Sequence, residues 1–285
     1  MNNSQIQIYC DGGSKTGYGH ISRSKALLSF LISQGLNSSI YGISNESNSL
    51  IGSDCHDNKD AKIIIFDSHK NLDKLILKEK NNNKTVITLD WFGKENPDYN
   101  IIVFPHFKPN SIIKSYVGFK YVIIRDEILI LKETIKIQNK ALVCIGGGDL
   151  LNQGHLASES LYKKGFDVTL IIGKSGKKAF DTKMYKVLNN PKNFSELLAS
   201  SSFVVTNGGG CMFESVFLNI PTWALPQTKF ENNVVNCFIN SNSIVGQGLD
   251  SLRNFKIEKL QIMNNKNIID GLGKNRIFKI INNLV

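Results

Sequence analysis

The sequence lacks the short motifs that mark the commonest cofactor and metal sites. None of its glycine-rich turns has the GxGxxG spacing of a dinucleotide site or the Lys-Ser or Lys-Thr ending of a P-loop. The cysteines form no CxxC pair, and four histidines show no metal-ligand spacing with cysteines or carboxylates: His56, His69, His106 and His155. We therefore predict that the protein holds neither a metal ion nor a cofactor.

Long apolar runs are also missing. The longest are far shorter than the roughly 18 residues that a membrane-spanning helix needs. Met1–Ile8 does not have the basic region and apolar stretch of a signal peptide. The five cysteines are odd in number, which suits reduced thiols. We expect a soluble, cytoplasmic monomer without stable membrane insertion.

The charge of the chain is strongly basic. A formal net charge of +10 makes phosphate-bearing ligands, nucleic acids and membrane surfaces candidate partners. The lysines, however, are scattered along the sequence and are not interleaved with aromatic side chains on one helix face. This pattern favours a solvated basic surface over a nucleic-acid footprint, so we expect no nucleic-acid partner.

Short apolar runs alternate with longer amphipathic runs, as in a parallel sheet with crossover helices. A first series predicts helices at Ser22–Gln34 and Asn71–Lys80 and strands at Gln5–Cys10, Ser38–Gly42, Lys62–Phe66, Thr85–Leu89 and Asn100–Phe104. A second series predicts helices at Leu150–Lys164, Cys211–Leu218 and Glu231–Asn240 and strands at Ala141–Ile145, Asp167–Ile172, Phe203–Thr206 and Pro221–Leu225. We therefore predict two similar α/β domains, residues 1–135 and 136–285, joined near Glu127–Lys140, with the last helix able to pack back on the first domain.

Glycine-rich turns directly follow three of the predicted strands. They are Asp11–His20, Cys144–Asn152 and Thr206–Ser215. Ligands of open parallel sheets bind at this edge, where glycine lets the backbone approach a ligand and a helix start offers N–H groups to a phosphate. One such turn can be only a tight connection, but three of them over both halves favour an anion site.

Two side chains in these turns are candidates for the chemistry. His20 lies at a helix entrance, where a neutral imidazole can act as a general base; a capping or core role is the alternative. Glu214 lies one helical turn after Gly210 and could bond the two hydroxyls of a ribose whose phosphates rest on the glycines; a surface salt bridge is the alternative. Cys211, at the same helix start, is expected to be packed rather than reactive.

Seven sequence segments, spread over nearly the full chain, resemble the conserved motifs of one enzyme family. They are TGYGHISR (Thr16–Arg23), IIIFDSH (Ile63–His69), GFKYVIIRDE (Gly118–Glu127), CIGGGD (Cys144–Asp149), TNGGGCMFES (Thr206–Ser215), FENN (Phe230–Asn233) and DGLGKNRI (Asp270–Ile277). Together they resemble the nucleotide-sugar hydrolases of pseudaminic acid biosynthesis, in the superfamily of the peptidoglycan glycosyltransferase MurG.

The resemblance implies an α/β fold of the GT-B type, with two Rossmann-like domains whose parallel sheets face a central cleft. The carboxyl-terminal domain would hold the nucleotide, and the amino-terminal domain would present His20, which aligns with the catalytic histidine of the family; no metal would be required. Residues expected to contact the nucleotide-sugar substrate are Asp11, Gly17, Tyr18, Gly19, Arg23, Gly146, Gly147, Gly209, Gly210, Glu214, Glu231 and Asn232.

The activity implied by the resemblance is hydrolysis of a UDP-activated diacetamido-trideoxyhexose to the free sugar and UDP, with His20 activating water. The chain differs from the family pattern at Tyr9, Gly12, Gly13, Asn233 and Asp90-Trp91. These differences favour an alternative, a GT-B glycosyltransferase that joins a UDP- or CMP-linked sugar to a glycan acceptor. The joint presence of His20, Glu214 and Asn232 argues against a third hypothesis, a non-catalytic sugar-nucleotide-binding protein.

Overall fold

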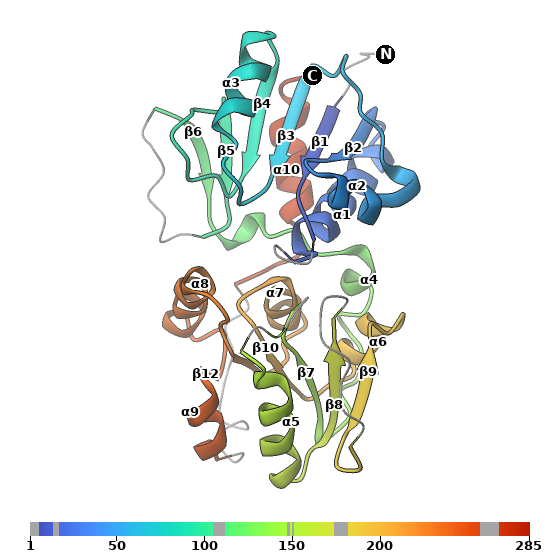
Figure 1. Cartoon of the computed structure of the whole chain (residues 1–285), viewed down its shortest axis with the longest axis vertical. Coiled ribbons are helices and arrows are strands. Elements are labelled where there is room, and N and C mark those ends of the chain that lie inside the picture. Colours follow the sequence, from blue (N-terminus) through green and yellow to red (C-terminus); the bar gives the residue numbers. More distant parts are fainter. Residues whose placement is uncertain are drawn as a thin grey trace. The chain divides into compact units, whose positions relative to one another are not determined.

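Short, buried strands build a separate parallel sheet in each half of the chain. The structure, a computed structural model, describes residues 6–13, 17–104, 112–146, 149, 151–173, 182–256 and 268–285. The chain divides into two compact units, which are Met1–Arg125 with Gly271–Val285 (unit 1) and Asp126–Asp270 (unit 2). Figure 1 labels the helices and strands of each unit.

The sheet of unit 1 has, among the described residues, six parallel strands in the order β2-β1-β3-β4-β5-β6. Their bounds are β1 Ile6–Cys10, β2 Ser38–Gly42, β3 Ile63–Asp67, β4 Thr85–Leu89, β5 Tyr99–Ile102 and β6 Lys114–Val117. β3 is buried at every position, as expected of a central strand in a parallel sheet covered on both faces. Cys10 pairs with Asp67, and Asp67 pairs with Leu89, so β1, β3 and β4 end at the same edge.

The described helices of unit 1 lie between or after these strands in the sequence, and the last of them, α10, follows all of unit 2. Their bounds are α1 Gly19–Ser33, α2 Asn45–Ile51, η1 Gly52–Asp54, α3 Asp73–Asn81, η2 Phe119–Tyr121 and α10 Gly273–Asn282. α1 packs on β1 and β2 and also contacts α10. A Cβ atom at Gly273 would collide with the Val122 carbonyl, so glycine permits the close approach of α10 to η2.

The sheet of unit 2 has six parallel strands within the described residues, in the order β12-β11-β10-β7-β8-β9. Their bounds are β7 Lys140–Cys144, β8 Asp167–Ile172, β9 Lys186–Asn189, β10 Phe203–Thr206, β11 Thr222–Ala224 and β12 Gly246–Gln247. The helices described around this sheet are α4 Asp126–Leu129, α5 Gln153–Lys163, α6 Phe194–Ala199, α7 Gly210–Phe217, α8 Lys229–Asn240 and α9 Leu249–Asn254. Helices α5 and α9 lie side by side (Figure 1).

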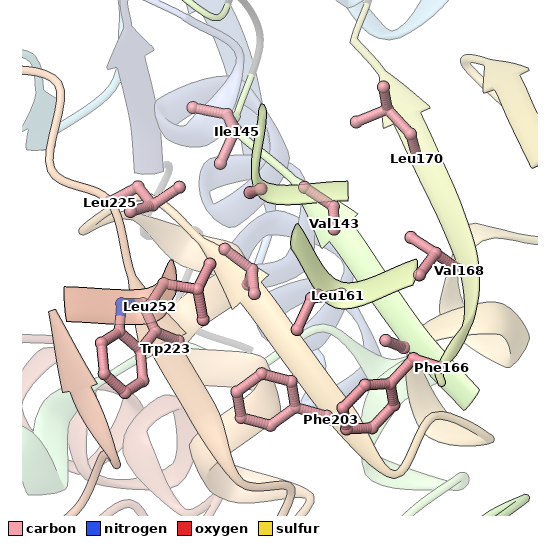
Figure 2. Close-up of a cluster of buried hydrophobic side chains, with 13 residues drawn as sticks. Val143, Ile145, Leu161, Phe166, Val168, Leu170, Phe203, Trp223, Leu225 and Leu252 are labelled. Carbon is pink, nitrogen blue, oxygen red and sulfur yellow. The ribbon is translucent and has the colours of Figure 1, made fainter. Parts of the chain in front are cut away.

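The core of unit 2 lies under α5 and α9. Figure 2 shows Phe203, at the start of β10, beside Phe166, with Leu161 of α5 and Leu252 of α9 in the same cluster. The rings of Phe203 and Phe166 are stacked with their centroids 5.6 Å apart, and both side chains are buried. Dense packing of this kind holds the loops at the carboxyl ends of the strands on a rigid base.

The predicted α/β fold with two parallel sheets is confirmed. Four strands, β2, β4, β8 and β10, have the predicted bounds, and the other predicted strands differ by one or two residues at one or both ends. β6, β9 and β12 were not predicted. They are short edge strands whose residues are half-buried or exposed, so they lack the apolar run that marks a buried strand.

The division between the units falls after Arg125, earlier than the predicted boundary after residue 135. The reason is α4, which contacts α6 of unit 2 and places Ile128 at 0% exposure. Residues 271–285, which the predicted boundary assigned to the second domain, lie in unit 1 through α10.

The described helices are all too short or too polar to cross a membrane.

Candidate functional site

The carboxyl ends of β1, β3 and β4 and the first turn of α1 bring a group of ionisable side chains together in unit 1. Tyr18 is the N-cap residue of α1, Gly19 begins the helix and His20 follows it. Asp67 is the last residue of β3, and Asp90 directly follows β4. The sheet register therefore carries the two aspartates to the edge at which α1 starts.

His20 and Asp67 form a buried pair. Nδ1 of His20 lies 2.5 Å from Oδ1 of Asp67, and the two residues are 8% and 0% exposed. A carboxylate at Nδ1 fixes the imidazole tautomer in which that nitrogen carries the proton, and so leaves Nε2 as the basic nitrogen. This pairing gives His20 the orientation that a general base requires.

Arg23, one turn further along α1, binds Asp67 and Asp90 at the same time. Its Nε and Nη2 donate to Oδ2 and Oδ1 of Asp67 at 2.8 and 2.5 Å, and its Nη1 donates to Oδ2 of Asp90 at 2.8 Å. The hydroxyl of Ser24 also donates to Asp67, at 2.8 Å. Asp67 is therefore held in place by partners other than His20.

The charges in this network set the protonation of the two aspartates. Burial acts to raise the pKa of Asp67, but the Arg23 guanidinium and then His20 outweigh it and hold that pKa well below its usual range. For Asp90 burial prevails over the opposing effect of Arg23, and its pKa is raised. Asp67 is therefore ionised beside His20.

His69, two residues after Asp67, packs edge-on against His20. The ring centroids are 4.4 Å apart with an interplanar angle of 85°. Desolvation beside the network and the nearby His20 and Arg23 lower its pKa to about 4. His69 is therefore neutral near pH 7 and adds no charge beside His20.

The loop between β1 and α1 is held by its own contacts. Asp11 is 1% exposed, and its Oδ1 accepts hydrogen bonds of 3.0 Å from Ser47 Oγ and Lys70 Nζ. Gly17 has a φ of +76°, which favours glycine, and exchanges two backbone hydrogen bonds with Gly13. Of the predicted contact residues in unit 1, Asp11, Gly17, Tyr18 and Gly19 shape the loop that leads to His20, while Arg23 is engaged with the two aspartates.

In unit 2 the turn after β7 already contains an anion. Asp149 accepts hydrogen bonds from the backbone N–H groups of Gln153 and Gly154, which begin α5. Its carboxylate therefore occupies the positive end of that helix. Gly146 has a φ of +57°, and Gly147 lies outside the described residues.

Replacing Asp149 by alanine is expected to lower the free energy of unfolding by about 1 kcal/mol, since two N–H groups of α5 lose their acceptor. Urea unfolding of the variant, with Asp167→Ala at an exposed aspartate of unit 2 as the control, measures the effect. Equal midpoints for the two variants would contradict the capping role.

The turn after β10 differs from the turn after β7. Gly209 is the N-cap residue of α7, and within the described residues no side chain accepts a hydrogen bond there as a cap. A Cβ atom placed on Gly210 would meet nothing described within 4 Å. The start of α7 therefore presents backbone N–H groups and open space, which suit a phosphate. Glu214, one turn further on, is 7% exposed.

The third loop, between β11 and α8, is joined to the α7 turn by Glu231. Its carboxylate accepts from Asn207 Nδ2 and from the Gln227 backbone N–H, both at 2.7 Å. Glu231 therefore braces two loops at the carboxyl edge of the sheet. Asn232, beside it in the first turn of α8, is exposed.

Cys211, at the start of α7, is half-buried. A hydrogen bond with the thiol of Cys144, followed by burial, raises its pKa well above the usual value. Thiols with a raised pKa are poor nucleophiles near neutral pH. Across the described part of the chain, no group of three or more His, Cys, Asp and Glu side chains is arranged to hold a metal ion.

The position of His20 at a helix entrance could be recognised from the sequence, whereas the partner that orients it, Asp67, was not predicted as a site residue. Asp67 and Asp90 each directly follow a strand predicted from the sequence, and in a parallel sheet the ends of neighbouring strands meet. That rule is the signal by which the two aspartates could have been assigned to the edge beside His20.

The fold matches solved structures over its whole length. MurG of Acinetobacter baumannii superposes with a TM-score of 0.63 at 9% identity, covering 98% of this chain and 99% of that chain. UDP-GlcNAc 2-epimerase from Neisseria meningitidis bound to UDP-GlcNAc gives 0.65 at 10% identity over 98% and 100% of the two chains. The glycotransferase of kitacinnamycin gives 0.67 at 12% identity over all of both chains. The fold is therefore GT-B, the fold of glycosyltransferases and nucleotide-sugar epimerases.

Sequence comparison gives less detail. The chain is 25% identical over 294 aligned positions to an uncharacterized protein of Methanocaldococcus jannaschii, covering 84% of this chain. It spans 59% of the length of that protein. No family model matches the sequence. The likeness of its motifs to the nucleotide-sugar hydrolases thus stays a prediction.

Proposed function

We propose that this chain is a GT-B enzyme that cleaves the glycosyl–phosphate bond of a nucleotide-activated sugar and transfers the sugar to an acceptor hydroxyl. His20 removes the proton of the acceptor through Nε2, and Asp67 stabilises the imidazolium that forms. The observation that carries the proposal is the 2.5 Å contact between His20 Nδ1 and the buried Asp67 at the start of α1. Both the base and the carboxylate that orients it are then residues of unit 1.

Nucleotide binding is assigned to unit 2. The open start of α7 at Gly210 provides N–H groups for the diphosphate, whose charge they stabilise as the bond breaks. Glu214 is the proposed acceptor for the ribose hydroxyls, and Asn232 contacts the sugar. The UDP-GlcNAc 2-epimerases that share the fold support a UDP-linked substrate.

Water can take the place of the acceptor hydroxyl in the same reaction. The motif resemblance supports this second candidate, hydrolysis of a UDP-activated diacetamido-trideoxyhexose. Both reactions need one positioned base and a leaving group whose charge is held, and they differ only in the oxygen that is deprotonated.

The decisive experiment is to incubate the protein with UDP- and CMP-linked sugars, with and without glycan acceptors, and to follow nucleotide and sugar by mass spectrometry. We expect UDP release that depends on an acceptor. Release of UDP and free sugar without acceptor would replace glycosyl transfer by hydrolysis. Intact sugar nucleotides under every condition would overturn the proposed function.

Replacing Gly210 by alanine is expected to weaken UDP binding by about 10-fold, or about 1.4 kcal/mol, because the methyl group would enter the space assigned to the phosphate. The fold should tolerate the change, since alanine favours a helix more than glycine does. Calorimetric titration with UDP, together with thermal unfolding, separates the two effects. An unchanged dissociation constant would remove α7 as the phosphate site.

A further inference from the structure

Asp90 combines two features that normally destabilise a fold. Its φ is +54°, in the left-handed region that non-glycine residues rarely adopt, and its side chain is a carboxylate at 2% residue exposure. A strained backbone conformation and a buried charge at one residue persist only where contacts with the surrounding structure stabilise them, and such residues cluster at functional sites. The contacts of Asp90 show what they achieve.

The carboxylate of Asp90 has one partner on each side. Oδ1 accepts from the backbone N–H of Val103 at 2.8 Å, just beyond β5, and Oδ2 accepts from Arg23 Nη1 at 2.8 Å. The backbone N–H of Asp90 donates to the Ile101 carbonyl at 2.8 Å. Asp90 is thereby fixed between two strands with its second oxygen aimed at Arg23.

Alternating charges then run from Asp90 to His20. Arg23 donates hydrogen bonds through one nitrogen to Asp90 and through two nitrogens to Asp67. Asp67 in turn pairs with Nδ1 of His20. Nη2 of Arg23 also lies 3.4 Å from that same Nδ1. The position of the guanidinium therefore affects the electrostatic environment of the imidazole directly, and so does the extent to which carboxylates neutralise its charge.

We propose that Asp90 is a positioning residue for the reaction, which acts on His20 through Arg23 and Asp67 and is not a contact residue of the substrate. This inference rests on the proposed function, in which His20 is the base. Asp90 draws the guanidinium away from the imidazole and offsets its positive charge. Without that carboxylate, Arg23 would lie beside His20 with less of its charge compensated and would lower the proton affinity of the base.

The other ionisable groups around His20 are not altered when Asp90 is replaced. Asp67 and His69 face it from the end of β3, and Arg23 faces it from α1. Asp11, at the end of β1, is paired with Lys70. Replacing Asp90 alone changes one charge of the network and none of these direct neighbours.

The test is Asp90→Asn, which keeps the size of the side chain and a residue type that tolerates a positive φ. The matched control is Asp98→Asn, whose carboxylate binds the Val86 N–H near the start of β4. We expect the acid limb of the kcat/KM profile to move to lower pH by about half a unit and kcat to fall about 10-fold. KM for the sugar nucleotide should stay within about twofold, and the control should change none of these quantities.

A direct readout of His20 separates this inference from the proposed function. Long-range proton–nitrogen NMR spectra follow the tautomer and titration of His20 whether or not the enzyme turns over. A lower His20 titration midpoint in Asp90→Asn supports the positioning role of Asp90. An unchanged midpoint overturns that role even if His20 is essential for turnover. If Asp90→Asn does not fold, Arg23→Lys, which cannot bind both aspartates in the same geometry, is titrated instead with the same two outcomes.

Discussion

Replacing His20 by alanine is expected to lower the turnover number by on the order of 10²-fold or more, the usual contribution of a positioned general base. The variant loses the group that accepts the proton and leaves Asp67 with Arg23 and Ser24 as partners. Initial rates of UDP release, measured with saturating sugar nucleotide and acceptor, give the effect on kcat.

A matched control is His56→Ala, since His56 is an exposed histidine of the same unit that makes no part of the His20 network. Its turnover should equal that of the unchanged protein. If His20→Ala retained full turnover, the base would have to be another group, even if the substrate class were right.

The second large effect concerns stability. Phe203 is 0% exposed, and its ring stacks against Phe166 in the core of unit 2 (Figure 2). The ring of Phe255 stacks against it as well. Truncation to alanine leaves a cavity, and we expect the free energy of unfolding to fall by about 3–5 kcal/mol. Urea unfolding monitored by circular dichroism measures the loss.

The conservative variant Phe203→Leu keeps most of the volume and should cost less than about 1.5 kcal/mol if its neighbours repack. Equal losses for the two variants would mean that the aromatic stack, rather than the filled volume, stabilises this core. A loss below about 1 kcal/mol for Phe203→Ala would show that the core around Phe203 collapses without a cavity.

The sequence predicted the fold well where a strand is an uninterrupted apolar run. The segment around Ile63–Phe66 and the segment Phe203–Thr206 carry their own signal, because a strand buried on both faces tolerates few polar residues. Lys114–Val117 and Lys186–Asn189 carry no such signal, because their strands lie at sheet edges with half-exposed side chains. Their pairing is decided by the neighbouring strand, which local patterns do not contain.

The site was predicted in part for a similar reason. His20 could be named from its own surroundings, since a histidine in a glycine turn at a helix start is a local pattern. The role of Arg23 could not, because it depends on Asp67 and Asp90, which are 44 and 67 residues away in sequence. Its substrate contact stays a prediction, and the structure adds that Arg23 binds two buried carboxylates.

The turn after β7 is a local case, since Asp149 lies only four and five residues before the groups that it binds. From the sequence, its glycines indicated an anion site, and the turn before α7 was the more suggestive of the two. The structure shows that Asp149 folds back onto the N–H groups of α5, a contact that the glycine spacing does not reveal. The two turns thus have similar sequences and different electrostatic character.

Helix α10 also bears on the order in which this protein can fold during synthesis. Gly273–Asn282 packs on α1 and η2 of unit 1, although every residue of unit 2 precedes it in the chain. Since a ribosome releases the chain from its amino terminus, all of Asp126–Asp270 is available before α10 emerges. Unit 2 can form its core as soon as it is made, whereas the unit that carries His20 begins earlier in the chain and is complete only after α10 has been made.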